Sequence, residues 1–190
     1  PRGGIHDGHR PGLGRSLGGR SDCCDYPSSV SRKPVVVRSR IASDRLSSRG
    51  IHEEVQKLRR TGEHQYAIDV ALLARLQPDV VVTQELCEVC AATHPEIDEA
   101  IRQLPARPRI VSVTAMRIPE VEECITDLGR ALGRSRQAQA LCGKLRRSSA
   151  GLQRRLRGIG SKPRVWCVEW LDPLMVAGHW VPDMVAMAGG

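Results

Sequence analysis

Aromatic residues are scarce in this sequence: they make up 3% of its 190 residues, and phenylalanine is absent. A hydrophobic core must therefore be built mainly from valine, leucine, isoleucine and alanine. The three tryptophans, Trp166, Trp170 and Trp180, all lie near the end of the chain, between Val165 and Gly190. This concentration predicts a particular role for that segment.

Long apolar runs and catalytic motifs are also missing. No run approaches the roughly 20 apolar residues that a membrane-spanning helix needs, and no signal peptide is visible. The chain begins with Pro1 rather than methionine, so the missing signal says little about location. We find no phosphate-binding loop, no nucleophile elbow, no H-E-x-x-H motif and no dinucleotide fingerprint. The sequence therefore favours a binding protein over an enzyme.

Positive charge exceeds negative charge: 29 lysines and arginines stand against 21 acidic residues, a formal net charge of +8. Such an excess can indicate nucleic-acid binding. The basic residues, however, are spread over residues 38–60, 102–109 and 130–164, and no aromatic stacking residues alternate with them. We therefore predict no nucleic-acid partner and retain a basic nucleic-acid binder only as a third hypothesis.

The seven cysteines are an odd number, and a chain of this length does not need a disulfide scaffold, so we expect reduced or reactive thiols. Cys87 and Cys90 form a C-x-x-C pair that could hold a metal or carry redox chemistry, with Cys24 as a further candidate ligand. A buried pair or a simple disulfide is the favoured interpretation, because no second C-x-x-C pair completes a site. A metal or redox protein is the second hypothesis.

The hydrophobic pattern predicts an α/β lobe over residues 23–118, after a glycine- and arginine-rich segment, residues 1–22, that we expect to be mostly disordered. Strands are expected at 34–41, 79–84 and 109–113, and helices at 47–62, 66–79 and 95–103. This alternation of strand and helix is typical of a doubly wound fold with a parallel sheet.

Residues 119–160 follow a different pattern, because no proline occurs from Glu120 to about Arg157 and apolar residues recur at helical spacing. A continuous helix of this length would extend about 55 Å, so we expect a long connector along the body, with glycines that could bend or break it. Beyond it, a strand at 164–170 and a helix opening near Val181 and Pro182 begin a second α/β lobe, residues 161–190.

Three segments carry a resemblance to a known family: "GRSDCCDYP" (Gly19–Pro27), "LQPDVVVTQELCEVCA" (Leu76–Ala91) and "EWLDPLMVAGHWVPDMVAMAGG" (Glu169–Gly190). Together they resemble the iron/vitamin B12 periplasmic-binding family, the substrate-binding proteins of ABC importers, and most closely its cobalamin-binding branch. The resemblance implies two Rossmann-like lobes joined by a long backbone helix. Residues 1–12 lack the strand that opens the family's pattern, and the second lobe is incomplete, so we expect a chain truncated at both ends.

The resemblance also implies the ligand and its site. The ligand would be cobalamin or a related corrinoid in a cleft between the lobes, with an iron–siderophore or heme as the alternative and no cofactor required. The implied ligand-binding residues lie in loops: Tyr26, Gln84, Glu85, Trp170, Asp172, His179 and Trp180. We expect Trp166, inside a strand, to pack in the core. His179 is a hypothetical axial ligand of the cobalt.

The family further implies permease subunits of an ABC transporter as partners. It implies a location outside the cytoplasm, in the periplasm or anchored to the membrane. Without a visible signal peptide, a cytoplasmic location stays open.

Overall fold

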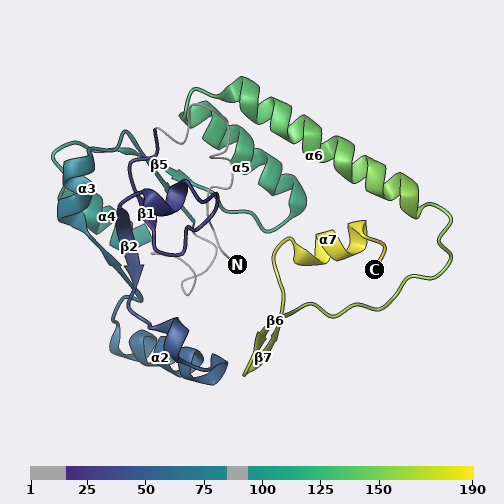
Figure 1. Cartoon of the computed structure of the whole chain (residues 1–190), viewed down its shortest axis with the longest axis horizontal. Coiled ribbons are helices and arrows are strands. Elements are labelled where there is room, and N and C mark those ends of the chain that lie inside the picture. Colours follow the sequence, from purple (N-terminus) through teal and green to yellow (C-terminus); the bar gives the residue numbers. More distant parts are fainter. Residues whose placement is uncertain (1–15, 85–93) are drawn as a thin grey trace. The chain divides into compact units, whose positions relative to one another are not determined.

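The computed structural model describes residues 16–84 and 94–190 (Figure 1). The chain divides between Ile110 and Val111 into two compact units, and each is described by itself. The domain limits expected from the sequence stay predictions. No helix in the described part of the chain is both long and apolar enough to cross a membrane.

The first unit contains a three-stranded sheet in the order β1 (Arg20–Ser21), β2 (Val35–Ser39), β3 (Tyr66–Ile68). β2 pairs parallel with β1 and antiparallel with β3. Short 3-10 helices, η1 (Val30–Arg32) and η2 (Ser43–Arg45), follow β1 and β2.

Residues 1–22 are predicted to be mostly disordered, but strand β1 lies within this segment. The prediction is therefore wrong for Arg20 and Ser21. The Arg20 amide donates to the Pro34 carbonyl and the Asp22 amide to that of Val37, both at 2.9 Å. The strand is therefore held by β2 rather than by an apolar pattern of its own.

Helix α2 (Ser48–Thr61) has the limits that its sequence predicts. The Ser47 hydroxyl accepts a hydrogen bond from the Gly50 amide at 3.2 Å, a standard way to satisfy the free amides at a helix start. Gly62 ends the helix at φ 70°, a left-handed conformation that favours glycine.

The single helix predicted over residues 66–79 is in fact a strand followed by a shorter helix, β3 and α3 (Val70–Leu76). Asp69 separates them, because its carboxylate accepts from the Leu72 amide at 2.8 Å and starts the helix there. The residues before Asp69 are extended and pair with β2: Ile68 lies opposite Val37.

Strand β4 (Val80–Thr83), helix α4 (His94–Arg102) and strand β5 (Arg109–Ser112) confirm the strand–helix–strand order predicted for this region. β4 and β5 form a separate two-stranded sheet. Two buried α4 residues, Ile97 and Ile101, centre a small core with these partly buried hydrophobic residues: Tyr66, Ile68, Val81, Leu104 and Ile110.

The described residues thus form a mixed α/β structure with small sheets, in place of the single doubly wound parallel sheet expected from the sequence. The antiparallel pairing of β3 with β2 accounts for part of this difference. A parallel pair between those two strands would have needed the chain to cross back over the sheet.

In the second unit, helices α5 (Ile118–Ala131) and α6 (Ser135–Leu156) lie side by side (Figure 1). The long connecting helix expected over residues 119–160 is therefore interrupted. Gly133 has φ 63° and donates to the Arg130 carbonyl at 3.3 Å, while the Arg134 amide donates to the Gly129 carbonyl at 2.6 Å. These two bonds close the end of α5 in a Schellman motif, after which the chain turns back.

The remainder of the second unit is a hairpin of β6 (Val168–Leu171) and β7 (Leu174–Val176), followed by helix α7 (Val181–Met187). α7 begins where Pro182 and Asp183 predict. The strand expected over residues 164–170 agrees with the structure only over its last three residues, because β6 begins at Val168. Trp166 lies outside β6 and is 78% exposed, so its predicted core packing is wrong.

Candidate ligand-binding residues

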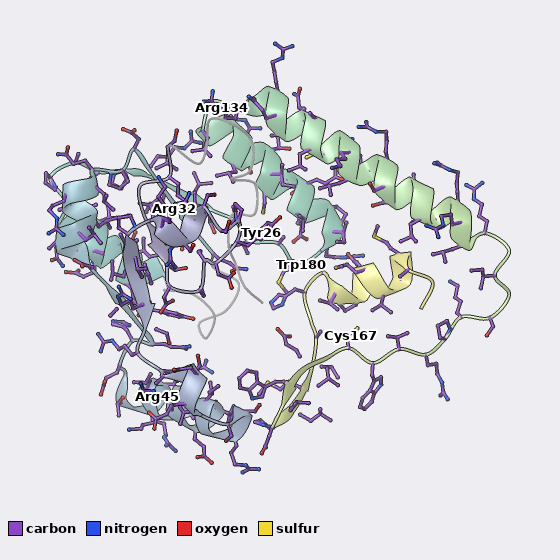
Figure 2. All side chains as sticks on the ribbon, viewed as in Figure 1. Tyr26, Arg32, Arg45, Arg134, Cys167 and Trp180 are labelled. Carbon is purple, nitrogen blue, oxygen red and sulfur yellow. The ribbon has the colours of Figure 1, made fainter. Side chains whose placement is uncertain are left out.

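The loop after β1 is braced by hydrogen bonds to its backbone. The Arg20 guanidinium donates to the carbonyls of Ser21 and Asp22 at 2.9 and 3.1 Å, and to that of Ser31 at 3.2 Å. The Asp22 carboxylate accepts from the Ser39 amide of β2 at 2.7 Å. This bracing fixes the loop that carries Tyr26, whose side chain is 58% exposed (Figure 2).

Cys23 and Cys24 occupy the turn at the start of this loop. The Cys24 amide donates to the Ser21 carbonyl at 3.1 Å, which closes the turn. The Ser21 hydroxyl lies 3.2 Å from the Cys23 sulfur and 3.1 Å from that of Cys24. The sequence pattern indicated Cys24 as a candidate ligand, but it gave no sign that two adjacent thiols share one hydroxyl.

The two thiols differ in acidity because they hydrogen-bond to each other. The bond from Cys23 lowers the pKa of Cys24 from 9.0 to about 5, with smaller contributions from Ser21 and the positive charge of Arg20. The same bond, together with burial, raises the pKa of Cys23. Cys24 is therefore the more acidic thiol of the pair.

The other predicted residues of the first unit lie near the end of β4. Gln84 directly follows this strand and is half-buried. Glu85, Cys87 and Cys90 fall outside the described residues, so their predicted roles stay predictions.

A small cavity elsewhere in the first unit contains a histidine–glutamate contact that the sequence did not indicate. His64 Nδ1 lies 2.8 Å from Glu96 Oε1, and the Glu96 side chain is 7% exposed. The lining residues are Val55, Leu58, Arg59, Glu63, His64, Gln65 and Glu96. None of them is a predicted site residue, and His64 and Glu96 are 32 positions apart in sequence, so local spacing gives no signal for the pair.

In the second unit, the predicted residues form two local pairs. Trp170 Nε1 donates to the backbone carbonyl of Asp172 at 3.0 Å, within the β6–β7 turn. The His179 and Trp180 rings lie 6.2 Å apart between centroids, with their planes at 47°. All four residues are partly exposed, and Trp180 immediately precedes α7 (Figure 2).

His179 has φ 54°, an uncommon backbone conformation for a residue with a side chain. Backbone outliers of this kind gather at functional sites. The predicted ligand-binding role of His179 stays a prediction.

Asp183 ties α7 to the start of α5 within the same unit. Its carboxylate accepts two bonds from the Arg117 guanidinium, at 3.1 and 3.2 Å, and one from the Ile118 amide at 3.1 Å. The Arg117 hydrogen bond, followed by that of Ile118, holds the pKa of Asp183 below its ordinary 3.8. This contact fixes the start of α7, directly after His179 and Trp180.

Within residues 16–84 and 94–190, no three histidine, cysteine, aspartate or glutamate side chains are grouped as a metal ion would need. The described residues therefore supply no ready-made metal centre, and the axial role of His179 stays a prediction.

No protein-family profile matches the chain, and no curated protein matches it. Several solved structures, however, match the chain. The periplasmic heme-binding protein BhuT, in complex with two hemes, matches 92% of this chain and 56% of its own, with TM-score 0.60 and 20% identity. RhuT, a periplasmic heme-binding protein from Roseiflexus sp. RS-1, matches over 94% and 58%, with TM-score 0.65 and 18% identity. This chain shares the fold of periplasmic binding proteins.

A third structure with this fold is from Staphylococcus epidermidis and is described as a possible iron-binding, periplasmic solute-binding protein. It matches 94% of this chain and 59% of its own, with TM-score 0.64 and 16% identity. This chain spans less than two thirds of the length of all three proteins. Their descriptions name heme and iron, whereas the sequence pattern favoured cobalamin. The cobalamin branch thus gains no support from them.

Proposed function

We propose that this chain belongs to the substrate-binding protein of an ABC-type importer and contributes to binding heme or another iron chelate. The observation that carries the proposal is the match to periplasmic binding proteins over more than nine tenths of the chain, two of them described as heme-binding. The absence of catalytic motifs from the sequence agrees with binding rather than catalysis.

Tyr26 is the residue of this chain best suited to meet the iron. Its side chain is mostly exposed, and it lies in a loop whose backbone Arg20 and Asp22 brace. A phenolate oxygen is a hard donor that binds ferric heme, as catalase illustrates. Its ring also offers an apolar face to a porphyrin.

His179 and Trp180 are the corresponding candidates in the second unit. Neutral imidazole is a common metal ligand, and an indole ring stacks on flat apolar surfaces. Both side chains are partly exposed and lie directly before α7, which the Arg117–Asp183 pair holds in place.

A corrinoid is the second candidate ligand, favoured by the "TQELCEVCA" pattern over Thr83–Ala91. Cobalamin is also a large flat ring with a central metal, so the same aromatic and imidazole side chains would serve it. By the same proposal, the partners are permease subunits and the location is outside the cytoplasm.

The role of Tyr26 is tested by titrating the purified chain with hemin and recording the Soret and visible absorption bands. Because the chain has only two tyrosines, Tyr66 provides a matched control. Tyr66 lies in β3, packed against the Ile97 and Ile101 core. Tyr26→Phe removes the phenolate oxygen and keeps the ring.

Saturable binding with phenolate-to-iron absorption that Tyr26→Phe abolishes and Tyr66→Phe preserves would support the proposal. Identical spectra for the parent chain and Tyr26→Phe would remove Tyr26 from the site. A failure of the parent chain to bind hemin at all would count against the heme proposal for this chain.

A further inference from the structure

Cys23 and Cys24 are consecutive residues held in one closed turn, and neither forms a disulfide. The Ser21 hydroxyl lies within 3.2 Å of both sulfur atoms, and the two cysteine side chains hydrogen-bond to each other. Both sulfurs therefore lie on the same side of the turn as the serine oxygen.

The turn is fixed at its start by hydrogen bonds to neighbouring residues. The Arg20 guanidinium holds the carbonyls of Ser21 and Asp22, and the Asp22 carboxylate holds the Ser39 amide of β2. Cys23 is exposed and Cys24 is half-buried, so a small reagent reaches the pair from solvent. The site is accessible and arranged before any ligand arrives.

A disulfide between these two residues would be strained. Consecutive Cα atoms lie about 3.8 Å apart, whereas the Cα atoms of disulfide-bonded cysteines are usually about 4.4–6.8 Å apart. The pair therefore favours the dithiol form, in which both sulfurs are available to a ligand.

We propose that Cys23 and Cys24 form a two-sulfur binding site for a thiophilic metalloid, with trivalent arsenic as the best match. Thiolates select soft ions, and the described residues offer no third histidine, cysteine, aspartate or glutamate to complete a tetrahedral zinc site. Trivalent arsenic with one organic substituent needs only two further bonds, and sulfur atoms on adjacent residues can supply both.

The chemistry with phenylarsine oxide as probe is a condensation. Two As–S bonds form, the arsenic–oxygen bond breaks, and the oxygen leaves as one water with the two thiol protons. Arsenic stays trivalent and no electron is transferred, so no oxidant or reductant is needed.

The test uses the full chain, reduced, with Cys87→Ser and Cys90→Ser introduced so that the second cysteine pair of the sequence does not contribute. Phenylarsine oxide is added, and the intact protein is weighed after challenge with excess monothiol. We expect one phenylarsine per chain, which the monothiol leaves in place and a small dithiol removes, because a two-sulfur chelate resists single thiols.

Single-site variants then locate the arsenic. Cys23→Ser and Cys24→Ser should each lose the monothiol-resistant adduct, whereas Cys167→Ser, at a separate free thiol, should keep it. Equal circular dichroism spectra would show that the variants fold alike. An adduct that survives in Cys23→Ser or Cys24→Ser, or no resistant adduct in the starting chain, would overturn the proposal.

Discussion

Gly129→Ala tests the turn between α5 and α6 most sharply, because Gly129 is buried where the two helices meet. A Cβ atom placed on Gly129 would overlap the Cβ of Ala138 on α6. The obstacle is the first side-chain atom of a buried helical residue, so it moves only if the backbone of α6 moves. Overpacking of this kind costs about 1–3 kcal/mol.

Replacing a helical glycine by alanine also stabilises the helix, by about 1 kcal/mol. Because α6 would have to shift as a whole, we take the upper half of the overpacking range. The net loss is then about 1–2 kcal/mol in the free energy of unfolding. For a chain of this size, that lowers the melting temperature by roughly 2–8 °C.

Gly151→Ala is the matched control, since Gly151 lies in α6 with only the flexible end of Arg154 nearby, at 3.9 Å. It should raise stability by up to about 1 kcal/mol. Equilibrium unfolding in urea, followed by far-ultraviolet circular dichroism, measures both variants. Adding Ala138→Gly to Gly129→Ala removes the overlap and should recover part of the loss, giving a favourable coupling energy. If Gly129→Ala stabilises the chain as Gly151→Ala does, the helices do not meet here and the proposed packing is wrong.

Two further predictions follow from the pKa values. The depressed pKa of Asp183 means that its carboxylate stabilises the fold above the unfolded-state pKa, and that this contribution is lost as pH falls through the folded-state pKa. Asp183→Asn should therefore lower the urea midpoint at neutral pH, and its difference from the parent chain should vanish in acid; a constant difference would contradict this. At about pH 6, iodoacetamide should label Cys24, with its pKa of about 5, well before Cys124, whose pKa burial raises. Peptide mass mapping checks this, and equal labelling rates would refute it.

Elements with local signals were predictable from the sequence. Ser47 and Gly62 mark the limits of α2, and Pro182 with Asp183 marks the start of α7. In each case the residue that starts or stops the helix lies within one turn of it, so the pattern contains the cause.

The turn between α5 and α6 was not predictable to the residue. The sequence has glycines at 129, 133, 143 and 151 in this region, and locally they look alike. Only Gly133 takes a positive φ among them. Which of these glycines ends α5 depends on the packing of Gly129 against Ala138. This is a contact between two helices, and the periodicity within one helix cannot reveal it.

In the candidate site, too, some features were predictable from the sequence and others were not. The resemblance selected Tyr26, and the structure places it in an exposed loop. The brace that holds this loop uses Ser31 and Ser39, which are distant in sequence from the residues they contact, so no motif contained it. The position of Trp166 differs from the prediction because the predicted strand runs through it, whereas β6 starts at Val168.

The most direct test of the proposed function is a parallel calorimetric titration of the full chain with hemin and with cyanocobalamin. The proposal predicts saturable one-to-one binding of hemin, at least tenfold tighter than any binding of cyanocobalamin, and weaker in Tyr26→Phe. Tighter binding of cyanocobalamin would return the chain to the corrinoid branch that its sequence pattern favours. No binding of either ligand would contradict a role for this chain in holding a flat metal-containing ring.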